Sequence, residues 1–226
     1  DIEEEKEREK IQTQFFRAVS HELKTPLTII KGELEGMIYE VGEYKNKQKY
    51  LKHSLKVAND MENLIKEILS VAMMKEESFR LNEDTFNIAN TMKKVYRKYQ
   101  GIAEDKEIEI ITNIQEQYKF KGDERLIENA MSNIVGNAVI YSPKKEKVFI
   151  DFNDKNIKIE NTGVHIEKED LKQLFNPFFR VDKSRSRNTG GSGLGLYISK
   201  TIFDYHNISY KVENTEKGVL FRIELP

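Results

Sequence analysis

Hydrophobic residues in the first third of the chain recur at helical spacing. They form two stripes that step by three, four or seven positions: Val19, Leu23, Ile30, Leu34, Met37 and Val41, then Leu51, Leu55, Ala58, Ile65, Leu69 and Ala72. The pattern predicts two long helices, the first beginning within the charged stretch 3–10, with a turn between Gly42 and Lys47. Two such helices cannot bury both stripes alone, so we expect a second copy to complete a dimeric four-helix bundle. The alternative is that the stripes pack on the rest of the same chain.

The spacing changes after a polar stretch at residues 76–85, which we interpret as a linker between domains at 1–75 and 86–226. Helices are predicted at 88–103, 124–141, 167–175 and 195–206, and strands at 108–114, 148–152, 156–160, 209–213 and 219–225. Asp123 is a candidate N-cap for the second of these helices. Helices and strands without regular alternation favour a mixed sheet covered by helices.

Composition excludes several classes of protein. The 37 basic and 38 acidic residues leave a formal charge of −1, so there is no general basic field and we expect no direct nucleic-acid binding. The absence of Cys excludes disulfides, thiolate zinc sites and a Cys nucleophile. No apolar run approaches the roughly 18 residues of a membrane span. The chain begins with Asp1 rather than Met, so we expect a piece of a longer protein.

A glycine-rich segment, Gly190-Gly-Ser-Gly-Leu-Gly-Leu196, opens the last predicted helix. Alternating glycines let backbone N–H groups face a phosphate, and a helix N-terminus adds partial positive charge. The segment does not continue as a dinucleotide-binding fingerprint, and the chain contains no Gly-Lys pair of the kind that a P-loop needs. The alternative is a flexible connection into a helix.

Asparagines mark two further places. Asn133 and Asn137 are four residues apart on a predicted helix and share one face, where uncharged oxygens suit a Mg²⁺ ion that already carries phosphates. Asn161 ends a predicted strand just before Gly163, where its side chain is able to accept a hydrogen bond from an adenine amino group. Taken separately, these residues also fit helix caps, solvent-facing amides and a turn.

A histidine followed by a glutamate lies on the first predicted helix. The pair His21-Glu22 places a base beside a potential nucleophile. A zinc protease would need a second His where Thr25 stands, so zinc is disfavoured. Pro26 removes one helical hydrogen bond and is expected to bend the helix. The alternative is an ordinary surface histidine.

The order of these motifs resembles the catalytic core of bacterial two-component sensor histidine kinases, over nearly the whole chain. Residues 15–27 resemble the H box, 129–142 the N box, 159–166 the G1 box, 175–180 the F box and 190–196 the G2 box. The pattern is also similar to that of vancomycin-resistance-type sensors. The resemblance implies an α + α/β fold: a helical hairpin for dimerisation and phosphotransfer, then an α/β sandwich of the gyrase and Hsp90 type that binds ATP.

The resemblance also implies roles for individual residues. His21 would be the phosphoacceptor, Glu22 its orienting base, and Thr25 a residue for dephosphorylation of a response regulator. Asn137 would hold Mg²⁺, Arg180 would lie in a lid at about 166–190, and Asn161 would read adenine. The full set implied for ATP and Mg²⁺ is Asn133, Asn137, Tyr141, Asn161, Gly163, Arg180, Gly191, Gly193, Leu194 and Gly195. A homodimer and a response regulator with an acceptor Asp would be its partners.

Three positions depart from the family pattern: Asn161 stands where Asp is usual, His165 replaces a glycine, and Ile140 replaces a basic residue. We therefore expect weakened ATP binding. His165 is interpreted as a loop residue, and His53 and His206 as structural. Two alternatives remain: a nucleotide-binding dimeric scaffold without kinase activity, and a conformational ATPase of the gyrase or Hsp90 type. The full-length protein is expected in the plasma membrane, with this part in the cytoplasm.

Overall fold

The computed structural model describes residues 2–115, 117–181 and 191–226, with side chains in the first helix from residue 13 onward. The chain divides into two compact units, residues 1–73 and 74–226. The first contains helices and the second a sheet with helices on it, as the sequence predicts. Within the described ranges, no helix is long and apolar enough to cross a membrane.

The first unit is built on a helical hairpin. Helix α1 runs from Ile2 to Ile38, a 3-10 turn η1 occupies Gly42–Lys45, and helix α2 runs from Lys47 to Met74. The two predicted helices and their turn are confirmed, although α1 begins before the expected stretch. Helix α1 continues through Pro26, which lacks the N–H group that would bond the carbonyl of Glu22.

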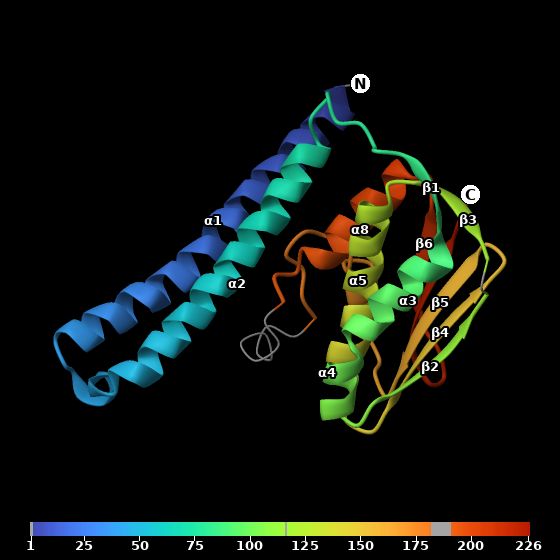
Figure 1. Ribbon diagram of the computed structural model, residues 1–226. Helices are drawn as coiled ribbons and strands as arrows, with labels where there is room; N and C mark the ends of the chain where they lie inside the picture. The colour runs from blue at the N-terminus through green and yellow to red at the C-terminus, as the bar shows by residue number, and fades with distance from the viewer. Residues whose placement is uncertain (1, 116, 182–190) are drawn as a thin grey trace. The chain divides into compact units, whose positions relative to one another are not determined.

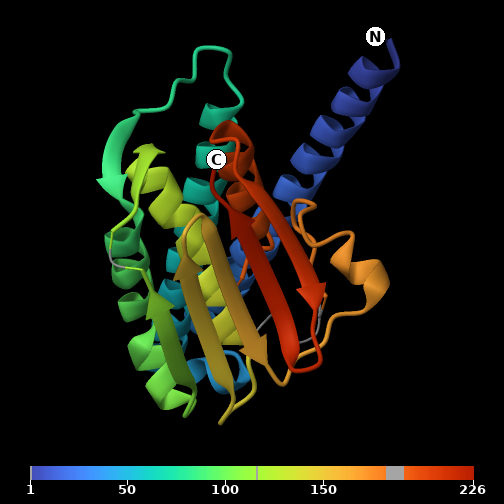
Figure 2. The same ribbon diagram turned by 90° about the vertical axis from the view of Figure 1, so that its right-hand side faces the viewer.

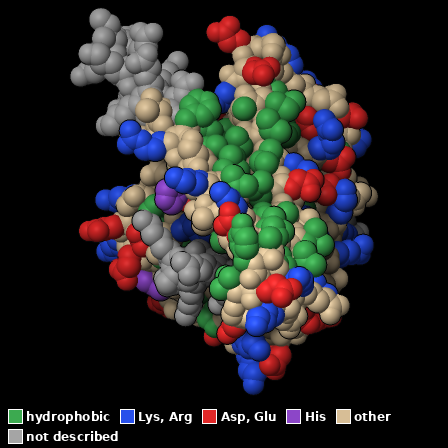
Figure 3. Space-filling view, turned by 90° about the vertical axis from the view of Figure 1, so that its left-hand side faces the viewer, with side chains coloured by type: hydrophobic (Ala, Val, Ile, Leu, Met, Phe, Trp, Pro, Cys, Tyr) green, Lys and Arg blue, Asp and Glu red, His purple; other side chains and the backbone are tan. Residues whose placement is uncertain are grey.

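The hairpin buries only part of its apolar surface. Phe15, Met37 and Leu64 are buried, and the seam between the helices also contains Glu33, whose carboxylate lies 2.5 Å from His53 Nδ1 and 2.5 Å from Ser54 Oγ. Much of the predicted stripe stays exposed, and Figure 3 shows hydrophobic side chains gathered on one face. The exposed members of the two stripes include Leu34, Leu51, Leu55, Ile65 and Leu69.

The second unit contains a five-stranded mixed sheet in the order β2-β4-β5-β7-β6. The strands are β2 (Glu109–Ile114), β4 (Lys147–Asn153), β5 (Asn156–Thr162), β6 (Ser209–Asn214) and β7 (Gly218–Glu224). Only β2 and β4 pair in parallel, and the other neighbours are antiparallel. Figure 2 looks onto this sheet with helices behind it.

Helices cover one face of the sheet. They are α3 (Ile88–Lys98), α4 (Gln100–Asp105), α5 (Glu124–Tyr141) and α8 (Gly195–Tyr205), with a short α6 at Lys168–Leu171. Helix α5 packs against α3, α8 and β5, so it forms the centre of the helical layer (Figure 1). Alternate residues of the strands, such as Ile150, Ile157 and Ile159, are buried beneath it.

The structure corrects three local predictions. The expected helix 88–103 is interrupted at Tyr99, whose hydroxyl donates to the carbonyl of Ser132 at 2.9 Å. The expected helix 167–175 is helical only over α6. Two short strands were not predicted: β1 (Asp84–Asn87) and β3 (Lys119–Gly122), which pair with each other.

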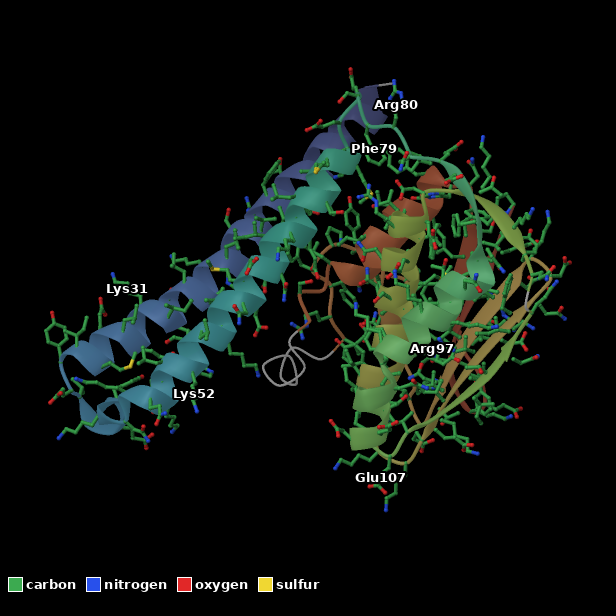
Figure 4. The ribbon with its side chains drawn as sticks, viewed as in Figure 1. Lys31, Lys52, Phe79, Arg80, Arg97 and Glu107 are labelled. Carbon is green, nitrogen blue, oxygen red and sulfur yellow. The ribbon has the colours of Figure 1, made fainter. Side chains whose placement is uncertain are left out.

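The polar segment before β1 is attached to the second unit. The ring of Phe79 lies edge-on to Tyr205, with centroids 5.1 Å apart, and the Tyr205 hydroxyl donates to the carbonyl of Met74. The N–H of Asn82 donates to Asp123 at 3.3 Å. Figure 4 shows Phe79 and Arg80 in this segment, between α2 and β1.

Candidate functional site

His21 lies on the outer surface of α1. Its side chain is 79% exposed, and its Nδ1 lies 3.7 Å from Oε1 of Glu22. This distance is too long for a hydrogen bond but short enough for the carboxylate to attract a proton on Nδ1. The opposite ring nitrogen, Nε2, is then the atom available to attack an electrophile.

The residues after His21 shape the helix locally. Thr25 Oγ1 donates to the carbonyl of His21 at 3.2 Å, which turns the threonine side chain back along the helix toward His21. Pro26 follows immediately and supplies no backbone donor. The structure therefore brings His21, Glu22 and Thr25 together on about one turn of α1.

In the second unit, the junction of α5 and α8 gathers several predicted residues. Asn133 donates from Nδ2 to the carbonyl of Gly195 at 2.9 Å. Ser199 Oγ donates to the carbonyls of Ala130 and Gly195 at 3.1 and 3.0 Å. These bonds fix the first turn of α8 against the middle of α5.

The described end of the glycine-rich segment has a constrained backbone. Gly193 has a φ of +79°, and a Cβ there would lie 2.8 Å from the backbone carbon of Phe178. Phe178 donates its N–H to the carbonyl of Gly193 at 3.0 Å, which ties the two segments together. Leu194 next to it is fully buried and anchors the start of α8. Gly190, also predicted, lies outside the described residues.

Two predicted carboxamides, one on α5 and one on β5, make no side-chain hydrogen bond to the described part of the chain. Asn137 is half-buried, and Asn161 is 8% exposed at the end of β5. Asn161 is paired in register with Val148, which opens β4 shortly after α5 ends. Neither carboxamide has a hydrogen-bond partner among the described residues, so both are available to a ligand.

Tyr141 and Gly163 lie at the same end of the domain. Tyr141 is 46% exposed, and its hydroxyl would be 3.4 Å from a Cβ placed on Gly191. Gly163 has a φ of +71°, and a Cβ there would collide with the side chain of Glu146. The carboxylate of Glu146 accepts a 2.5 Å hydrogen bond from Thr162, which fixes the turn after β5.

The remaining predicted residues are less constrained. Arg180 is half-buried at the end of the described part of the expected lid, and His165 is exposed. Residues 182–190 of that lid lie outside the described residues. Ile140 is half-buried, on the last turn of α5.

Sequence reasoning missed Lys106 as a support of the site. Its ammonium group donates to the carbonyls of Val139, Ile140 and Ser142 at 3.0, 2.7 and 2.5 Å, and it thereby caps the C-terminus of α5. Burial lowers the pKa of Lys106. The sequence contains no local signal for this role, because the partners lie more than 30 positions away.

His206 supports the other end of α5. Its Nε2 accepts a hydrogen bond from the backbone N–H of Asp123 at 3.0 Å, and its Nδ1 lies 2.8 Å from the carbonyl of Ile202. Since the carbonyl is only an acceptor, Nδ1 carries the proton and the ring is neutral. Asp123 caps α5 by accepting from the N–H groups of Arg125 and Leu126, as predicted.

Comparison with known proteins defines the class to which this arrangement belongs. Residues 11–77 match the His Kinase A (phospho-acceptor) domain, and residues 122–226 match the histidine kinase-, DNA gyrase B- and HSP90-like ATPase domain. The chain belongs to the sensor histidine kinase family and corresponds to the catalytic core of its members.

Individual relatives support this assignment. The chain is 36% identical over 230 residues to the sensor protein VanSB of Enterococcus faecalis, covering 100% of this chain and 52% of the relative. It is 28% identical to the sensor histidine kinase WalK of Bacillus subtilis, covering 38% of that protein. The chain thus spans about half the length, or less, of these two relatives.

Solved structures agree in fold. The histidine kinase AdeS of Acinetobacter baumannii superposes with a TM-score of 0.73 at 24% identity, over 91% of this chain and 96% of that chain. The histidine kinase ThkA, solved in complex with the response regulator protein TrrA, gives a TM-score of 0.73 at 23% identity, over 98% of this chain and 63% of that chain.

Proposed function

We propose that this chain uses ATP to phosphorylate its own His21 and then passes the phosphoryl group to an aspartate of a response regulator. The observation that carries the proposal is the exposed His21, with Glu22 beside its Nδ1, in one chain with an ATPase domain of the histidine kinase type. His21 must meet ATP in the first step and the response regulator in the second. An exposed imidazole with one oriented nitrogen is suited to both steps.

The residues on α1 would have different roles in the two reactions. Glu22 attracts the proton on Nδ1 and leaves the Nε2 lone pair directed outward to attack the γ-phosphorus. The terminal P–O bond breaks as the new N–P bond forms, and ADP leaves. Thr25, which bonds the His21 carbonyl one turn away, would orient a water molecule for dephosphorylation of the regulator.

The residues of the second unit fit a nucleotide. Backbone N–H groups at Gly191, Gly193 and Gly195 would face its phosphates, while Leu194, whose N–H donates to Ser192 Oγ at 3.0 Å, would anchor the segment through its buried side chain. Asn133 would fix the position of the segment, and Arg180 would add positive charge. The open carboxamide oxygen of Asn137 fits a Mg²⁺ ligand, and the ion would neutralise phosphate charge. Asn161 and Gly163 would contact the base, and Tyr141 would line the site.

The partners follow from the same proposal. The exposed stripe on the helical hairpin would be covered by a second copy of this chain in a four-helix bundle. The complex of ThkA with TrrA supports a response regulator as the second partner. Under this proposal the full-length protein is anchored in a membrane with this part on its cytoplasmic side, as the family resemblance implies.

The proposal is tested by incubating the chain with γ-labelled ATP and Mg²⁺. We expect a label that is stable in base and labile in acid, as phosphohistidine is, and expect His21→Gln to abolish it while ATP still binds. His53→Gln, which alters another histidine of the hairpin, is expected to retain the label. A label that persists in the His21→Gln chain would overturn the assignment, and binding without any label would favour a scaffold.

A further inference from the structure

Asn161 is the most enclosed polar side chain of the proposed nucleotide site. It continues the row of Ile157 and Ile159 on the helix-covered face of β5, and it is 8% exposed. Its neighbours in register are Val148 on β4 and Val219 on β7, both buried. The carboxamide therefore has apolar neighbours across both adjacent strands.

This carboxamide nevertheless reaches solvent. It has no hydrogen-bond partner within the described part of the chain, and no fully buried side-chain nitrogen or oxygen described there lacks one. Its polar atoms must therefore be accessible from outside, although the residue as a whole is enclosed. A side chain in this position presents one acceptor oxygen and one donor NH₂ group to whatever enters.

The valine neighbours do not fix the orientation of the amide by hydrogen bonds. Rotation by about 180° about the Cβ–Cγ bond exchanges the oxygen and the NH₂ group, and neither Val148 nor Val219 offers a side-chain hydrogen bond that would favour one orientation. In one orientation the amide matches adenine, which has a donor at N6 beside an acceptor at N1. In the other it matches a 6-oxopurine, which has an acceptor at O6 beside a donor at N1.

We propose that Asn161 makes the nucleotide site tolerant of 6-oxopurines, so that inosine and guanine triphosphates bind with affinities close to that of ATP. The inference rests on the proposed function, since it concerns the base in the same site. A carboxylate at this position would accept hydrogen bonds only, so it would match the adenine amine and would repel O6 of a 6-oxopurine bound in the same pose. The neutral amide of Asn161 removes that discrimination.

The test compares the binding of ATP, ITP and GTP to the whole chain by calorimetric titration with Mg²⁺. ITP has the O6 and N1–H groups of guanine without its 2-amino group. It therefore shows the effect of the hydrogen-bonding pattern on affinity without the added bulk of that amino group. We expect ITP to bind within tenfold of ATP. In Asn161→Asp, we expect ITP affinity to fall at least tenfold more than ATP affinity.

The control is Asn156→Asp, which makes the same chemical change at the other end of β5 and is expected to leave the ratio of ITP to ATP affinity unchanged. ITP binding more than a hundredfold weaker than ATP in the unmodified chain would overturn the inference and leave the proposed function intact. An equal ratio in Asn161→Asp and the unmodified chain would also overturn it. Failure of all three nucleotides to bind would overturn the proposed function together with this inference.

Discussion

The geometry of His21 depends on a neighbour in sequence rather than on a distant element. Glu22 is the next residue of α1, and its carboxylate approaches Nδ1 at 3.7 Å although both side chains are substantially exposed. An exposed pair of this kind contributes little to stability. Under the proposed mechanism, the pair instead affects the rate of phosphorylation, because Glu22 selects which ring nitrogen of His21 carries the proton.

Glu22→Gln tests whether Glu22 accelerates the phosphorylation of His21. We expect the rate of phosphorylation of His21 to fall about a hundredfold, because the amide is a much weaker base and attracts the Nδ1 proton less. ATP affinity and the unfolding transition are expected to stay unchanged. The measurement is the initial rate of labelling at saturating ATP.

Glu35→Gln is the matched control for Glu22→Gln, since Glu35 is also an exposed glutamate on α1 and pairs with Lys31 at 3.7 Å. Its labelling rate is expected to equal that of the unmodified chain. Equal rates in Glu22→Gln and the unmodified chain would contradict the assigned role of Glu22.

At the scale of elements, α5 is the helix on which the candidate site depends. It carries Asn133 and Asn137, and it is held at both ends by side chains from elsewhere. Asp123 and His206 fix its N-terminus, and Lys106 fixes its C-terminus. The positions of the two asparagines therefore depend on residues that contact no part of the candidate site directly.

Lys106→Met tests the C-terminal support. Methionine keeps much of the packing of the lysine stem but leaves the carbonyls of Val139, Ile140 and Ser142 without their donor. We expect the free energy of unfolding of the second unit to fall by about 1–3 kcal/mol. Urea unfolding measures the change.

Lys172→Met serves as the control for Lys106→Met, because Lys172 is exposed and its side chain has no polar partner within the described residues. It is expected to change the unfolding free energy by less than about 0.5 kcal/mol. Equal losses in the two variants would show that the Lys106 cap contributes nothing specific.

The elements also show what local sequence can and cannot predict. Helix α5 and its Asp123 cap were predicted because the cap, the apolar period and Pro143 are all local signals. Strands β1 and β3 were missed because each has four residues and exists through pairing with the other, about 35 positions away. The interruption between α3 and α4 lies at Tyr99, whose hydroxyl bonds the carbonyl of Ser132 on α5, so no local sequence pattern predicts it.

The same distinction applies to the candidate site. His21, Glu22 and Thr25 lie within five residues, so their proximity on a helix follows from spacing alone. The bond from Asn133 to Gly195 joins residues 62 positions apart, and the sequence indicated it only through the order of motifs. Lys106 belongs to no motif, and only the fold reveals it.

At the scale of the whole molecule, the helical hairpin leaves a large apolar surface for a partner. Leu55 and Leu69 are 63% and 55% exposed, whereas a lone soluble domain seldom displays many such side chains together. Burial of the area that is still exposed on each of these leucines would contribute about 1–2 kcal/mol in a dimer. Burial of these side chains therefore favours the proposed bundle.

The double variant Leu55→Glu/Leu69→Glu tests the dimer. We expect the unmodified chain of 26.5 kDa to sediment at about twice that mass. The variant is expected to weaken self-association at least a hundredfold, because four charges would be placed in an apolar core. Analytical ultracentrifugation over a range of concentrations measures both.

Ile102→Glu is the control for the double variant, since it adds charge at a 41% exposed apolar position of the second unit. It is expected to leave the dimer intact. A monomeric unmodified chain at all concentrations would contradict the proposed assembly.

The tautomer of His206 has a spectroscopic consequence. Its Nδ1 proton is enclosed and held by the carbonyl of Ile202, whereas His21 and His165 are exposed. In a proton magnetic resonance spectrum, this ring proton should exchange with water slowly enough to give a resolved downfield signal. Because the same ring binds the backbone of Asp123, that single resonance would report on whether the C-terminal end of α8 stays attached to the N-terminus of α5 while nucleotide is turned over.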